Sequence, residues 1–127
     1  MHKTILLLLA VASSNAMAEW VEISHNAKFT VYTNPATIRN KDDMATVWKL
    51  SDYKTAQSLG GHTHLSEKVQ FEYDCKEKQN RLLYFSWHSG NMGGGEVVYS
   101  GSGTNRWEPV PQGSINEAVL KIACRNK

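Results

Sequence analysis

The sequence predicts an α+β fold: a single antiparallel sheet of about six strands, with a C-terminal helix packed on one face and one disulfide. Three observations support this prediction. Residues 65–75 alternate between apolar and polar side chains, residues 114–127 carry apolar side chains at helical spacing, and the chain contains two cysteines. A small β-sandwich is the alternative, and the strong helix signal makes it the less favoured one.

Several short segments are rich in β-branched and aromatic residues, as strands are. The predicted strands are residues 19–24, 28–33, 44–53, 65–75, 81–89 and 96–100. The first two are expected to form a hairpin. A polar connection is expected over 36–43, a loop around Gly60-Gly61 over 54–64, and an irregular, proline-bearing connection over 101–113.

The clearest strand pattern lies in residues 65–75. The side chains that share its apolar face are Leu65, Val69, Phe71, Tyr73 and Cys75. Only Glu67 interrupts this face. Such alternation is typical of a half-buried antiparallel strand, with the cysteine on the core side.

Residues 81–89 are apolar on both faces, as in a central strand that is covered on both sides. Strict alternation places Leu83, Phe85 and Trp87 on one face and Leu82 and Tyr84 on the other. One short helix cannot cover these aromatic residues together with Trp48. We expect them to fill a second layer, to meet another subunit or to form an exposed recognition surface, unless loops 54–64 and 101–113 fold over the second face.

The C-terminal residues predict an amphipathic helix. Ser114 and Glu117 form an S-x-x-E capping box, in which each side chain satisfies a free backbone N–H of the first turn. Glu117, Lys121 and Arg125 recur every four residues as a narrow solvent-facing stripe, so the rest of the helix must be covered. Cys124 lies at the edge of the apolar face.

Residues 1–18 have the layout of a cleaved secretory signal peptide, so residues 19–127 are expected to form a single domain. Lys3 precedes an apolar run over residues 5–12, and Ala16-Met17-Ala18 ends the segment. The apolar run is too short to span a bilayer, which needs about 20 residues, and no later segment is apolar enough. No cysteine follows the cleavage site for lipidation. We therefore expect an exported protein, periplasmic or secreted, with surface display undecided.

Both cysteines lie in the predicted mature chain, and an exported chain meets an oxidising compartment in which two cysteines usually pair. A bridge from Cys75 to Cys124 would fasten the helix across the sheet. It would close a loop of about 50 residues, worth about 4 kcal/mol at most in the chain-entropy model. A metal or redox role would need a C-x-x-C pair or histidine ligands at fixed spacing, and neither surrounds these cysteines.

Composition and motifs disfavour several classes of function. A formal net charge of +2 is too small for the basic face of a nucleic-acid-binding protein. Gly93-Gly94-Gly95 precedes a strand and not a helix, so a phosphate would meet no helix N-terminus there, and the glycines indicate a turn. No G-x-S-x-G elbow occurs. We expect a non-enzymatic protein without a cofactor.

Two groups of residues are candidates for binding. His62 and His64 alternate in an extended segment and could share a metal ion with His88, although exposed loop histidines are the simpler interpretation. The candidate contacts for a protein partner are the aromatic Tyr84 and Trp87 with the basic Lys76, Lys78 and Arg81. A soluble hairpin tip is the simpler interpretation of the basic residues.

The order of several motifs resembles the surface-adhesin protein E family of small exported bacterial domains. These motifs are VWKLSDY, EYDC, MGGGEVV, RWEPVPQGS and a helix ending KIAC. The resemblance covers nearly the whole predicted mature chain. It implies an antiparallel sheet with a packed helix, a Cys75–Cys124 bridge, a Gram-negative source and, as an option, a homodimer. For the founding adhesin it further implies binding to host extracellular-matrix and serum proteins.

The sequence therefore leaves two functions open. The first is an adhesin-like module that binds a protein partner, with extracellular-matrix proteins as the expected class. The second is a periplasmic accessory or stress protein without an adhesive role, one form of which would respond to metal through His62 and His64.

Overall fold

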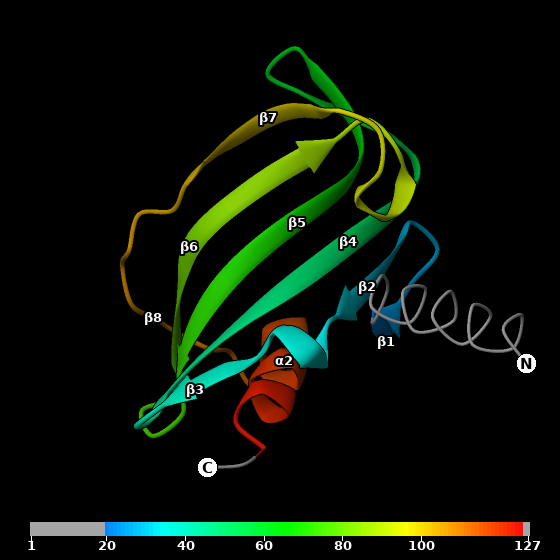
Figure 1. Ribbon diagram of the computed structural model, residues 1–127. Coiled ribbons are helices and arrows are strands. Elements are labelled where there is room, and N and C mark those ends of the chain that lie inside the picture. The colour runs from blue at the N-terminus through cyan, green and yellow to red at the C-terminus, as the bar shows by residue number, and fades with distance from the viewer. Residues whose placement is uncertain (1–19, 126–127) are drawn as a thin grey trace, which may run out of the picture.

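The computed structural model describes residues 20–125, so the predicted signal peptide lies outside the described residues. Eight strands form one sheet, and a helix near the C-terminus packs against it (Figure 1). The elements are β1 (Val21–His25), β2 (Phe29–Thr33), the 3-10 helix η1 (Pro35–Thr37), β3 (Arg39–Lys41), β4 (Met44–Leu59), β5 (His62–Asp74), β6 (Gln79–His88), the 3-10 helix η2 (Asn91–Gly93), β7 (Val97–Ser102), β8 (Glu108–Pro109) and α2 (Ile115–Ala123).

Every strand pair is antiparallel, and the main path of the sheet runs β1-β2-β4-β5-β6-β7. This confirms the predicted single antiparallel sheet with a C-terminal helix. Two short strands occupy segments that were predicted as connections: β3 pairs with β4, and β8 pairs with β6. All residues of both strands are exposed, and pairing through backbone groups does not require the apolar residues that reveal a strand in a sequence.

The predicted loop over residues 54–64 is wrong, because this segment is the end of a long hairpin. β4 continues to Leu59 and β5 begins at His62, with a turn at Gly60 and Gly61, whose φ angles are positive. The register shifts between Asp52 and Gln57, where residues 53–56 of β4 stand opposite Leu65 alone. The extension of β4 is mostly exposed, so it carries no apolar alternation that would reveal a strand.

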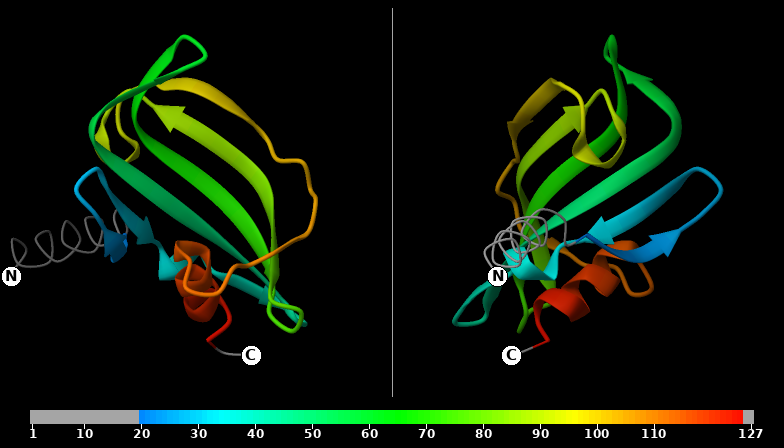
Figure 2. Two further views of the ribbon diagram at one scale, coloured as in Figure 1. Left: turned by 180° about the vertical axis from the view of Figure 1, so that it is seen from behind. Right: turned by 45° about the vertical axis from the view of Figure 1, so that its right-hand side comes forward.

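Alternation along the strands gives the sheet two faces. The helix face carries Ala45, Val47 and Tyr73, which are fully buried in the core that contains α2. Trp48 pairs with Gln70 and points the other way, to what we term the open face. α2 lies at the end of the sheet that carries β3 and leaves the end with the β4–β5 turn uncovered (Figures 1 and 2).

β6 departs from strict alternation at a bulge. Leu82 pairs with Phe71, and Tyr84 pairs with Gln70, so Leu83 has no partner of its own in the β5 ladder. Phe71 and Gln70 are adjacent on β5 and point to opposite faces. Leu82 therefore shares the helix face with Phe71, and the prediction that Leu82 and Tyr84 share a face is wrong. Because Leu82, Leu83 and Tyr84 are all apolar or aromatic, the sequence does not show which residue is inserted at the bulge.

The predicted cap and disulfide of the helix are present. Ser114 Oγ accepts a hydrogen bond from the Glu117 N–H at 3.1 Å. The Glu117 carboxylate accepts one from the Gly113 N–H at 2.9 Å, one residue before the cap. Cys75 and Cys124 form a disulfide with their Cα atoms 5.8 Å apart, which joins the end of β5 to the end of α2. Within residues 20–125 no helix is both long and apolar enough to cross a bilayer.

The triglycine stretch lies in the loop that joins β6 to β7, where the sequence predicts a turn. Its Gly93 and Gly95 have positive φ angles. Ser66 Oγ accepts a hydrogen bond from the Gly93 N–H at 2.9 Å, and the Asp52 carboxylate accepts one from the Met92 N–H at 2.7 Å. The loop is thereby fastened over part of the open face. We had expected residues 54–64 and 101–113 to be the segments that could cover a second face.

Candidate functional site

A cluster of aromatic rings lies at the end of the helix face that α2 leaves uncovered. The end of the β4–β5 hairpin, the end of β6 and the start of β7 meet there (Figures 1 and 2). We term this region the hairpin-tip surface. It is defined by the side chains of Tyr53, Leu59, His62, His64, Trp87 and Tyr99.

The rings of the hairpin-tip surface stack on one another. The His64 ring lies nearly parallel to Trp87, with centroids 4.4 Å apart, and the His62 ring stacks on Tyr99 at 4.8 Å. Trp87 and Tyr99 lie 5.0 Å apart, and Tyr53 meets His64 edge-on at 5.7 Å. Because each ring is held by a neighbour from another strand, the cluster forms a rigid platform.

Glu67 is the acidic group of this region, and its contacts explain why a charged residue interrupts an apolar face. Its carboxylate accepts a hydrogen bond from the Trp87 indole N–H at 2.8 Å. Burial, and after it the charge of Glu67, raises the pKa of Tyr53. Burial lowers the pKa of Lys49, and the charge of Glu67 opposes this change. Glu67 therefore both positions the indole and balances the charge of the half-buried Lys49.

A pocket of about 340 Å³ opens beside the rings, lined by Tyr53, Leu59, His64 and Trp87 among others. Of the rings beneath it, His64 is buried, only 4% exposed, and Tyr53, His62 and Trp87 are half-buried. Leu59 and Tyr99, by contrast, are 61% and 45% exposed. Exposed apolar side chains beside partly buried aromatic rings, with a few polar atoms around them, suit non-covalent contact with another molecule.

Comparison with known proteins identifies the family of this chain. The family model described as Surface-adhesin protein E matches residues 20–125. The chain belongs to the surface-adhesin protein E family. Membership in a family of surface adhesins implies that the protein is exported. No curated protein gives a significant match to the sequence.

Solved structures of Haemophilus influenzae protein E share the fold of this family member. Crystal form II of that protein matches with a TM-score of 0.70 and 9% sequence identity, over 86% of this chain and 89% of that chain. A second structure of the same protein gives a TM-score of 0.69 at 9% identity, over 86% of each chain. At this level of identity the likeness concerns the fold alone.

The structure separates the two aromatic residues that we predicted to contact a partner of this adhesin-family protein. Trp87 lies in the hairpin-tip surface, on the helix face. Tyr84 lies on the open face, where its ring meets Trp48 edge-on with the centroids 6.0 Å apart. The two residues therefore do not belong to one binding surface.

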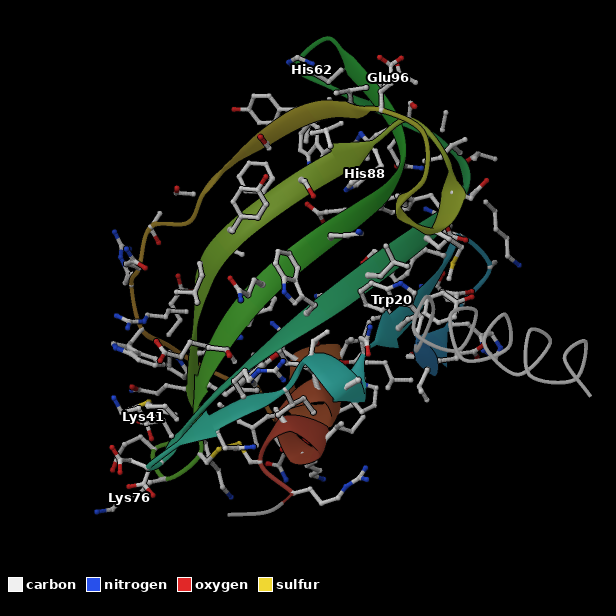
Figure 3. All side chains as sticks on the ribbon, viewed as in Figure 1. Trp20, Lys41, His62, Lys76, His88 and Glu96 are labelled. Atoms are coloured by element: carbon white, nitrogen blue, oxygen red, sulfur yellow. A yellow bond between two sulfur atoms is a disulfide. The ribbon has the colours of Figure 1, made fainter. Side chains whose placement is uncertain are left out.

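The predicted basic contacts lie at the other end of the sheet. Lys76 and Lys78 are exposed in the β5–β6 turn, and Lys76 lies far from His62 of the hairpin-tip surface (Figure 3). Arg81 Nε donates a hydrogen bond to Glu72 at 2.7 Å, and its guanidinium lies over the Trp107 ring at 4.6 Å. Arg81 is thus engaged within the protein, and the structure does not bring the basic group to Trp87.

The three histidines proposed as metal ligands do not lie together. His62 and His64 both reach the hairpin-tip surface but stack on different rings, whereas His88 Nε2 lies 2.8 Å from Ser86 Oγ. Within the described part of the chain, no group of three or more His, Cys, Asp or Glu side chains is placed to hold a metal ion. Metal binding by His62 and His64 stays a prediction, which the melting temperature with added zinc or copper would test.

Sequence reasoning missed Tyr53, Leu59, Glu67 and Tyr99. A signal existed for Glu67, because it is the one charged residue on the apolar face of its strand. Tyr53, Leu59 and Tyr99 join the surface through cross-strand pairing and the register shift in β4. A single sequence carries no signal for the pairing of the strands or for the register shift.

Proposed function

We propose that the protein is a non-enzymatic, adhesin-type module that binds a protein partner through the hairpin-tip surface, with extracellular-matrix proteins as the partner class. The observation that supports this most is the exposure of Leu59 and Tyr99 on a platform of stacked rings. Family membership supports the adhesive role, because the family is named for a surface adhesin.

The rigidity of this platform favours binding. Aromatic anchors contribute much of the free energy of protein binding, and they lose little conformational entropy when they are already ordered. Tyr99 is ordered by His62 and Trp87 before any partner arrives. The half-buried Glu67 supplies a carboxylate beside the apolar centre, where protein interfaces carry polar groups.

The proposal is tested by binding of the purified protein to immobilised fibronectin, laminin and collagen, followed by hydrogen–deuterium exchange of the complex. We expect protection of amides in residues 53–64 and 97–101, and no change in the β5–β6 turn at residues 74–79. No binding at high micromolar concentration would overturn the choice of matrix proteins. Protection confined to residues 74–79 would overturn the choice of surface.

A further inference from the structure

A second group of aromatic residues crosses the open face, on the side of the sheet opposite to the hairpin-tip surface. The register places Trp48 beside Gln70, and Gln70 beside Tyr84. On the side of Trp48 away from Gln70, the Asn34 N–H donates a hydrogen bond to the Trp48 carbonyl at 3.4 Å. Trp20 directly precedes β1 and lines one pocket with Asn34 and Trp48. Aromatic and amide side chains therefore alternate along a row, which we term the open-face row.

The pocket in this row has a volume of about 280 Å³ and is lined by Trp20, Asn34, Thr37, Trp48 and Lys68. Two indoles provide apolar surface, and one lysine provides the charge. A pocket of this size suits a small ring with polar substituents better than an extended apolar molecule.

Polar side chains of the row are placed to bind a ligand. Within residues 20–125, the Lys68 ammonium makes no ion pair and no hydrogen bond, and neither does the Gln70 side-chain amide. Asn34 Oδ1 accepts a hydrogen bond from the Ala36 N–H at 3.2 Å, which leaves its NH₂ group available. Asn34 and Lys68 thus give the pocket an amide donor and a cation.

Gly93 confines the lysine to this position. A β-carbon at Gly93 would lie 2.5 Å from Lys68 Cε, so the lysine stem passes through space that only glycine leaves open. Gly93 also donates its N–H to Ser66 Oγ, which fixes the loop against the sheet. The loop therefore restricts the freedom of the one cation in the pocket.

We propose that the pocket between Trp20 and Trp48 binds an acidic sugar, a hexuronate unit of an unsulfated glycan. The C–H face of a sugar ring packs on an indole, and its hydroxyls need planar groups that donate and accept hydrogen bonds. Asn34 is such a group in the pocket, and Gln70 lies beside Trp48 in the row. Lys68 pairs with the carboxylate, because a single confined cation matches one charge and not the several charges of a sulfated glycan.

Gln70 and Tyr84 continue the row and hold the neighbouring sugar. This site lies on the opposite face from the hairpin-tip surface and shares no residue with it. Its binding of sugar is therefore independent of the proposed binding of proteins, and either can fail without the other.

The four tryptophans of the chain make a direct test possible by NMR, because their indole N–H signals are separate probes. We expect hyaluronan tetrasaccharide to shift the signals of Trp20 and Trp48. Trp87 is bound to Glu67 and Trp107 to Arg81, so their signals serve as internal controls that stay in place. No shift of Trp20 and Trp48 at millimolar sugar would overturn the proposal.

Variants then test the role of the charge. Lys68→Gln shortens the side-chain stem and removes its charge, and we expect it to weaken hyaluronan binding about tenfold, because a charge-assisted hydrogen bond is lost. Binding of the neutral chitotetraose should stay unchanged. Lys54→Gln, which alters an exposed lysine elsewhere on the sheet, is the matched control. Equal affinity of wild type and Lys68→Gln for hyaluronan, or tighter binding of a heparin tetrasaccharide, would overturn the assignment.

Discussion

His88 links the protonation of one residue to the stability of the whole fold. Its side chain lies in a buried position, 6% exposed, against Ser86. Burial, and after it the positive charge of Lys68, lowers its pKa below the usual value of 6.5. The unfolded chain therefore binds a proton at a higher pH than the folded protein does. Stability should consequently fall as the pH drops below 6.5 and the unfolded state gains that proton.

We predict that the free energy of unfolding in urea decreases between pH 7.5 and pH 5.5, by about 1.4 kcal/mol per pH unit at most. His88→Gln should keep a hydrogen-bonding group beside Ser86 and lose most of this dependence. His25→Gln is the matched control, because His25 is exposed at the end of β1. A wild-type stability that does not change over this range would contradict the prediction.

At the scale of elements, the helix depends on its covalent link to the sheet. α2 has only nine residues, which is too short to be stable alone. Val119, Leu120 and Ala123 bury one side of it, and the bridge from Cys124 to Cys75 holds its end. The two cysteines are separated by 49 positions, so the bridge restricts a long stretch of the unfolded chain.

We predict that the double variant Cys75→Ala, Cys124→Ala loses up to about 4 kcal/mol of unfolding free energy. Urea unfolding followed by circular dichroism measures this loss, and reduced wild-type protein should behave in the same way. If the variant and the oxidised wild type were equally stable, the helix would be held by its apolar contacts alone.

The elements also show how far the sequence predicts this fold. The strand at residues 65–75 and the helix cap at Ser114 were predictable, because alternation and capping are local patterns that burial enforces. The long β4–β5 hairpin was not, since Lys54, Thr55 and Ala56 are exposed and carry no alternation. The bulge at Leu83 was not either, because an inserted residue is visible only in the pairing with β5.

At the scale of the whole molecule, the candidate site was even less predictable from the sequence than the strands were. His62, Trp87 and Tyr99 come from β5, β6 and β7, and only the register of the sheet brings their rings together. The sheet itself tolerates extensive change, since Haemophilus influenzae protein E shares the fold at 9% identity. The fold therefore follows from patterns that many sequences satisfy, whereas the surface depends on particular side chains.

The molecule thus separates stability from recognition along the helix face. One end is covered by α2 and forms the core, and the other end leaves Leu59 and Tyr99 exposed on stacked rings. The double variant Leu59→Ser, Tyr99→Ser removes both exposed apolar groups and leaves the stacked His64 and Trp87 rings in place. Val21→Ser changes a comparably exposed apolar residue on β1 and is the matched control.

The dissociation constant of this double variant for the bound matrix protein decides whether the hairpin-tip surface is the binding site. We predict at least about a tenfold weaker affinity, because exposed aromatic and aliphatic anchors carry much of the binding free energy, with a melting temperature close to that of the wild type. Val21→Ser should bind as the wild type does. An unchanged affinity of the double variant, or an equal loss in Val21→Ser, would contradict the proposed function.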